Sequence, residues 1–79
     1  MIDCKLVTRT ENTAGEREVF VSQVDIKGDA ILAGRQFLLN CANSGNIAWA
    51  EADVVLNGVK VAGGIVQNKT SVWTDGMSN

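Results

Sequence analysis

The stretch that decides the fold runs from Asp25 to Gly45 and reads DIKGDAILAGRQFLLNCANSG. It carries a helical pattern, whereas the segments before and after it alternate between apolar and polar residues as strands do. A step of 100° per residue places five residues within one arc, which is the predicted buried face: Ala30, Gly34, Phe37, Leu38 and Cys41. Because no other segment shows this pattern, we expect the strands to pack against this helix.

Both ends of the helix carry recognisable residues. Gly28 and Asp29 mark the start, since a carboxylate there accepts from the amides of the first turn or lies near the positive end of the dipole. Gly45 is suited to a left-handed cap after the last turn. Gly34 lies on the buried arc, where it is predicted to permit close approach to the sheet.

The opposite side of the helix carries two leucines seven residues apart. This outer helix face consists of Leu32, Arg35, Gln36 and Leu39. One interpretation is that single exposed leucines are ordinary on a protein surface. The other is that the face contacts a second copy of the chain or another protein.

Strands are predicted on both sides of the helix. The first two cover residues 2–10 and 17–26, joined by a polar loop, and the Phe20 side of the second is predicted to be buried. The alternative would place Gln23 and Asp25 in the core without obvious partners. A third strand covers residues 46–56, and the segment 71–73 has the pattern of a short additional edge strand.

Asn57-Gly58 predicts a two-residue type I′ hairpin between the third strand and the next one. With that loop, the pairs expected on the helix side are Leu56 with Val59, Val54 with Val61, Ala52 with Gly63 and Ala50 with Ile65. The pairs expected on the other side are Val55 with Lys60, Asp53 with Ala62, Glu51 with Gly64 and Trp49 with Val66. Gly63-Gly64 is predicted to mark a bend or bulge.

The predicted fold is α+β, with ββαββ order, an antiparallel sheet of about four strands and one helix packed on one face. Residues 1–79 are expected to form a single domain, since the chain is too short for two. The second face of the sheet has no helix to cover it. We therefore expect that face to meet solvent or a partner.

The composition argues against some classes of function. The net charge is −2 and the seven Lys and Arg residues are scattered, which argues against direct nucleic-acid binding. The sequence shows neither an apolar run of membrane-spanning length nor a basic leader followed by a hydrophobic stretch. A cytoplasmic location is therefore expected, with no membrane partner.

The residues of common catalytic sites are missing. The sequence has no histidine and no phosphate loop, nucleophile elbow or metal-binding motif, so we expect no enzyme, no catalytic residues, no cofactor and no metal site. Cys4 and Cys41 have no metal-ligand spacing and are predicted to be reduced, buried thiols. A disulfide or a reactive thiol is the alternative.

The predicted partner-binding site lies on the uncovered face of the sheet and consists of Trp49, Glu51, Asp53 and Lys60. Tryptophan is a common anchor at protein interfaces, and carboxylates beside it suit a partner that presents Arg or Lys. Alternatively, Trp49 covers the sheet locally and the two acids keep the face soluble. Trp73 either closes the open end of the core or extends the surface.

One segment resembles a known family. The string GEREVFVSQVDI at residues 15–26, followed by a helix containing Ala30, Ala33, Arg35, Gln36 and Leu38, resembles the strand-then-helix segment of small phage-encoded anti-CRISPR proteins that act on type I effector complexes. The similarity covers residues 15–42. It maps no functional residue of that family onto a position of this chain.

The resemblance implies an inhibitor that binds a type I CRISPR surveillance complex in the host cytoplasm and blocks target DNA binding or nuclease recruitment. Its acids would then face Arg and Lys of a DNA-binding groove. A net charge of −2 favours a steric block with local salt bridges over imitation of duplex DNA. The alternative function is a small structural or assembly module, either a monomer or a homodimer through the outer helix face.

Overall fold

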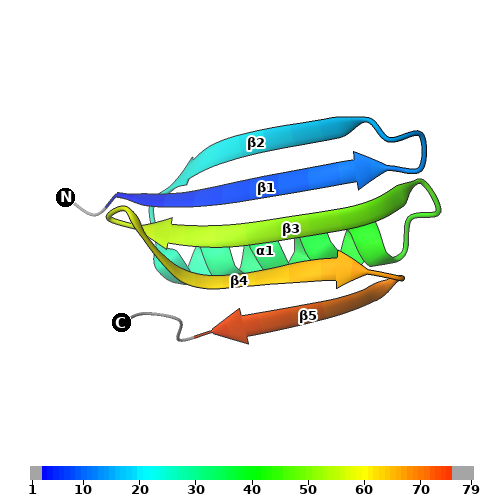
Figure 1. Ribbon diagram of the computed structural model, residues 1–79. Helices are drawn as coiled ribbons and strands as arrows, with labels where there is room; N and C mark the ends of the chain where they lie inside the picture. Colours follow the sequence, from blue (N-terminus) through cyan, green and yellow to red (C-terminus); the bar gives the residue numbers. More distant parts are fainter. Residues whose placement is uncertain (1–2, 76–79) are drawn as a thin grey trace.

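The protein is an antiparallel sheet with one helix across it, as the computed structural model of residues 3–75 shows (Figure 1). The helix α1 spans Lys27–Ala42, and the strands are β1 (Cys4–Asn12), β2 (Arg17–Val24), β3 (Ile47–Leu56), β4 (Val59–Gln67) and β5 (Thr70–Asp75). The strand order is β2-β1-β3-β4-β5. The α+β prediction is confirmed, but the segment at 70–75 forms a full fifth strand, so the order is ββαβββ rather than ββαββ.

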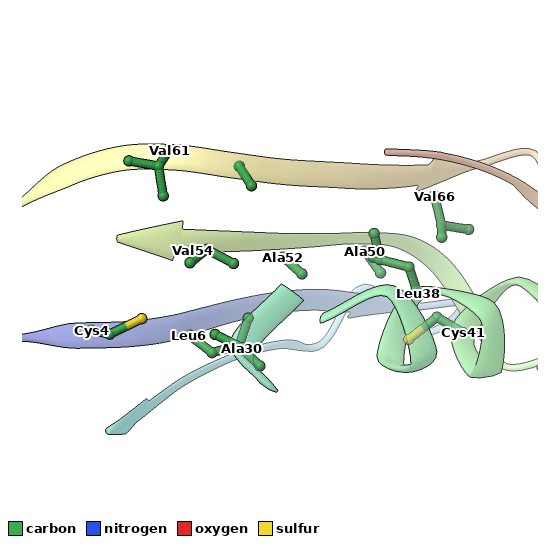
Figure 2. Packing of buried hydrophobic residues seen from close by; sticks show 11 residues of the cluster. Cys4, Leu6, Ala30, Leu38, Cys41, Ala50, Ala52, Val54, Val61 and Val66 are labelled. Atoms are coloured by element: carbon green, nitrogen blue, oxygen red, sulfur yellow. The ribbon is translucent and has the colours of Figure 1, made fainter. Parts of the chain in front are cut away.

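The core lies between α1 and one face of the sheet (Figure 2). The helix contributes Ala30, Gly34, Leu38 and Cys41 from its buried side, with Phe37 half-buried beside them, so the predicted arc is confirmed. The three central strands contribute mostly small and β-branched residues, at alternate positions except for the consecutive Val61 and Ala62 at the bulge of β4: Cys4, Leu6, Ala50, Ala52, Val54, Val61, Ala62 and Val66. Small side chains on the sheet let the helix approach closely.

The start of α1 follows one of the two predicted arrangements, whereas its end differs from the prediction. Ile26 occupies the N-cap position and makes no side-chain capping hydrogen bond, while Asp29 lies in the first turn, where its charge favours the helix dipole. At the other end the amides of Asn43 and Ser44 donate to the carbonyls of Leu39 and Cys41. Gly45 does not adopt a positive φ, so the left-handed cap predicted there is wrong. The last turn closes with ordinary right-handed geometry at Asn43 instead.

The helix does not cover the whole sheet. Figure 1 shows α1 running behind β3 and its neighbours, with β2 at the edge beyond it. Phe20 pairs with Thr8, whose side chain faces the core, so Phe20 is on the helix side; yet 61% of its surface is exposed. The predicted burial of the Phe20 side is therefore wrong. Alternation shows which residues share a face, but not whether the helix reaches that strand.

Two glycines make room for Trp73 at the other edge of the sheet. Trp73 pairs with Gly64 and lies on the helix side, half-buried against the core. A Cβ atom at Gly34 would lie 2.9 Å from the indole of Trp73, and one at Gly64 would lie 2.7 Å from it and 2.6 Å from Leu38. Trp73 thus closes the core beside β5, and Gly34 permits close approach as predicted.

The β3–β4 hairpin follows the predicted register for only part of its length. Asn57 and Gly58 have positive φ values of 49° and 83°, and Leu56 pairs with Val59 and Val55 with Lys60, as predicted. A bulge then leaves Val61 unpaired, so Val54 meets Ala62 instead of Val61.

Beyond this bulge each predicted partner is displaced by one residue, and the observed pairs are Asp53 with Gly63, Ala52 with Gly64, Glu51 with Ile65, Ala50 with Val66 and Trp49 with Gln67. The bulge therefore lies before Gly63-Gly64 rather than at it. As a result Val66 enters the core, while Ile65 faces away from the helix.

Candidate protein-binding face

The side of the sheet opposite α1, called the open face below, brings together the predicted site residues and a basic residue from β1. The register of β3 places Trp49, Glu51 and Asp53 on this face, because their neighbours Ala50, Ala52 and Val54 point into the core. Arg9 of β1 pairs directly with Glu51. The four predicted residues therefore share a face with a cation that lies 42 positions away from Glu51 in the chain.

Arg9, Glu51, Asp53 and Lys60 form a network of ion pairs, called the Arg9 cluster. The Nη1 atom of Arg9 donates to Oε1 of Glu51 at 2.9 Å and to Oδ2 of Asp53 at 3.1 Å. The Nζ atom of Lys60 lies 2.9 Å from Oδ1 of Asp53. Two cations and two carboxylates balance, so this part of the open face carries no net charge.

Asp53 is the buried member of the cluster, with 8% of its surface exposed. A carboxylate taken out of water is costly unless it is paired with opposite charge, and here Arg9 donates a hydrogen bond to Oδ2 while the Lys60 ammonium lies beside Oδ1, which accepts no hydrogen bond within residues 3–75. Gly63 makes the space: a Cβ atom there would lie 2.7 Å from Oδ1 of Asp53 and 3.0 Å from Cε of Lys60. The two consecutive glycines thus serve opposite faces, Gly63 the Arg9 cluster and Gly64 the core.

Trp49 borders a groove beside the Arg9 cluster. This Trp49 groove has a volume of about 550 Å³, and its lining comes from β1, β2 and β3: Arg9, Thr10, Glu11, Arg17, Glu18, Val19 and Trp49. Arg17 donates through Nε to Oε1 of Glu11 at 2.7 Å, so charges are paired here as well. The indole of Trp49 is half-buried and Val19 is exposed, which gives the groove an apolar surface between paired charges.

The outer helix face lies on the other side of the molecule. Leu32 and Leu39 are 68% and 49% exposed, and Arg35 and Gln36 are exposed between them. Arg35 and Leu39 line a shallow cavity of about 280 Å³ together with Leu38, Ser71 and Trp73. The structure therefore keeps the two predicted surfaces apart, one on each side of the sheet.

The two cysteines belong to the buried core and to neither predicted surface. Cys4 and Cys41 are free, buried thiols. Burial raises the pKa of Cys41, which lowers the fraction of the nucleophilic thiolate near neutral pH. Within residues 3–75, no three His, Cys, Asp or Glu side chains are grouped so that they could hold a metal ion. Across the same residues, α1 is neither long nor apolar enough to span a bilayer.

In comparisons with known proteins, no protein-family model matches the chain, and no curated protein or solved structure matches it significantly. What the protein does must therefore be inferred from its own residues.

Sequence reasoning located one side of the candidate site and missed the other. Trp49, Glu51, Asp53 and Lys60 were selected from the alternation of a single hairpin. The groove wall from β1 and β2, and the cation Arg9, depend on β1 lying next to β3. The alternation of residues in the first strand indicates that Arg9 faces away from the core. Alternation alone does not show which strand lies next to it.

Proposed function

We propose that the protein is a small inhibitor that binds a protein partner through the open face of its sheet, with Trp49 as the anchor. The observation that carries this proposal is the Trp49 groove, in which a half-buried indole and Val19 lie between paired charges on a face that no element of residues 3–75 covers. Grooves of this kind take an apolar or arginine side chain of a partner, and tryptophan is frequent at the centre of such contacts.

The charge balance of the open face supports a steric mechanism. Glu51 and Asp53 already pair with Arg9, and Asp53 pairs with Lys60 as well. A basic partner would have to displace these cations from a largely buried carboxylate, which is unfavourable. Shape and apolar contact at Trp49 therefore count for more than attraction between the acids and a basic groove.

The proposed partner is a type I CRISPR surveillance complex, which residues 15–42 suggest through their resemblance to phage-encoded anti-CRISPR proteins. Strand β2 and the whole of α1 fall in this segment, and Arg17, Glu18 and Val19 from it line the Trp49 groove. Occupying the complex at a DNA-binding or nuclease-recruiting surface would block interference in the host cytoplasm without any catalytic step.

The test is a binding assay with a purified type I effector complex, read by co-purification and by the retardation of labelled target DNA. We expect the double variant Trp49→Ala, Glu51→Lys to lose binding while its circular dichroism spectrum stays that of the wild type. The matched control is Leu32→Ala with Gln36→Ala on the outer helix face, which should bind normally. Equal affinity of the open-face variant would reject this surface, and failure of the wild-type protein to bind would reject the partner.

A second candidate is a self-associating structural module. The exposure of Leu32 and Leu39 on α1 favours it, since a narrow apolar strip on a helix is a common contact between copies. In that case Leu32→Asp with Leu39→Asp would convert a dimer into a monomer, and the protein would bind no effector complex.

A further inference from the structure

Strand β2 exposes apolar side chains on both faces of the sheet edge. Val19, Phe20 and Val21 are consecutive, and 60%, 61% and 61% of their surfaces are exposed. Phe20 lies on the helix side, whereas Val19 and Val21 lie on the open face, opposite Arg9 and Val7 of β1. β2 is an edge strand, because β1 is its neighbour on one side and its other side is unpaired among residues 3–75. Among these residues, its three adjacent exposed side chains make β2 the strand with the most apolar exposed segment.

From Val19 to Val24, the β2 edge lacks the devices by which proteins prevent strands from pairing. Such devices are prolines, bulges, inward-pointing charges and covering elements. The chain has no proline, and β2 pairs with β1 from Arg17 to Val24 without a shift of register. Its charged residues, Arg17 and Glu18, lie at one end. The middle of the strand therefore presents unpaired backbone N–H and C=O groups with which another strand could pair.

The charges around β2 suit a second copy of the same strand. Arg17 begins β2, and Asp25, which forms no ion pair within the described part of the chain, follows its last residue. Antiparallel pairing of two β2 strands places the first residue of each copy near the last residue of the other. With Phe20 opposite Phe20, Arg17 of each copy lies opposite Gln23 of the second copy, and Asp25 follows two positions further along on the same face, at the diagonal distance that a long side chain spans. Arg17, which also pairs with Glu11 of its own chain, then lies between two carboxylates.

We propose that two copies of the chain form a dimer by antiparallel pairing of their β2 strands about a two-fold axis at Phe20. The two five-stranded sheets then continue into one, with both helices on the same side. In this register Phe20 meets Phe20 of the second copy, and Val19 meets Val21.

The position of the two-fold axis follows from which side of the sheet each β2 residue faces. A two-fold axis normal to the sheet pairs each residue with one that points to the same side. Moving this axis by one residue would place Phe20 opposite Glu18 or opposite Ser22, and either position loses the contact between the aromatic rings. The register at Phe20 therefore buries the largest apolar area. This inference does not depend on the proposed inhibitor function.

The test uses the full chain and a double substitution that is mild in a monomer. Phe20→Lys with Val21→Lys changes exposed positions that do not line the Trp49 groove, and in the dimer it would place like charges face to face. We expect wild-type protein to reach twice its 8.4 kDa mass with rising concentration in sedimentation equilibrium. The double variant should stay at the mass of one chain, with an unchanged circular dichroism spectrum.

A matched control lies on the opposite edge. Val72 on β5 is 56% exposed, so Val72→Lys should leave the dimer intact. Phe20→Cys should form an intermolecular disulfide on mild oxidation, because directly opposed strand residues lie within bonding range, whereas Val72→Cys should not. Equal cross-linking of both variants would overturn the proposed register.

Three further results would overturn the proposal. Wild-type protein that remains at 8.4 kDa at every concentration would reject the second copy and leave the edge to a strand of another protein. A dimer that survives Phe20→Lys with Val21→Lys would reject the β2 edge. A dimer that Leu32→Asp with Leu39→Asp abolishes, while the β2 variant keeps it, would place the interface on the outer helix face.

Discussion

The two edges of the sheet each carry an aromatic residue on the helix side, and the two residues differ in how far they are buried. Trp73 on β5 is half-buried against α1, whereas Phe20 on β2 is 61% exposed. The difference lies in the neighbours: Gly34 and Gly64 leave a space into which the indole fits, and α1 lies toward that edge. An aromatic side chain thus joins the core only where other residues are small enough to admit it.

Replacing Trp73 should have the largest effect. We expect Trp73→Ala to lower the free energy of unfolding by about 2–4 kcal/mol, since a large side chain leaves a cavity between two glycines that cannot fill it. In a domain of this size that is a large share of the total stability. Urea denaturation followed by far-ultraviolet circular dichroism measures it.

The control is Val72→Ala on the same strand, which points to the open face and should cost less than about 0.5 kcal/mol. Equal losses for the two variants would mean that the β5 edge is no better packed than the β2 edge.

Filling the space beside Trp73 should have the next largest effect. A Cβ atom at Gly64 would lie 2.5 Å from the carbonyl oxygen of Val72 and 2.6 Å from Leu38, and a backbone oxygen in a paired strand has little room to move. We expect Gly64→Ala to reduce stability by about 1–3 kcal/mol through overpacking. The midpoint of thermal unfolding, compared with that of wild type, measures the loss.

Gly28→Ala serves as the counterpart, because a Cβ atom there meets open space near the start of α1. It should raise stability by up to about 1 kcal/mol through helix propensity. A stabilising effect of Gly64→Ala would contradict the tight packing of the β5 edge.

Replacing Phe20 should have the smallest effect on an isolated chain. At a concentration where the protein is monomeric, we expect Phe20→Ala to change the free energy of unfolding by less than about 1 kcal/mol, because most of the ring is already in water. Unfolding measured at several protein concentrations separates this intrinsic effect from that of dimer formation. A loss above about 2 kcal/mol in the monomer would show that Phe20 is packed, contrary to the contrast between the edges.

Those parts of the fold that depend on local periodicity could be predicted. The buried arc of α1 follows from helical spacing, and the turn at Asn57-Gly58 follows from the need for positive φ. The register beyond that turn could not be predicted, because the bulge at Val61 depends on how β4 bends beneath the helix. The exposed Phe20 likewise depends on where α1 lies across the sheet.

The candidate site was predictable on one strand only. Alternation in β3 placed Trp49, Glu51 and Asp53 on one side, and the structure has them there. Their partner Arg9 was not foreseen, because ion pairs across a sheet require the order of the strands. A pair of acids in a sequence therefore does not show an acidic surface until the opposing residues are known.

The pairing of β1 with β3 has a consequence for folding during synthesis. Cys4 at the start of β1 pairs with Leu56 at the end of β3, so the second neighbour of β1 exists only after residues 47–56 have been synthesised. Until then, the nascent hairpin of β1 and β2 has two unpaired strand edges, whereas in the folded sheet only the β2 edge of this hairpin is unpaired. Contacts so distant in sequence also slow the search for the native topology. The interval in which the newborn chain is most prone to mispairing is therefore the time needed to translate α1 and β3.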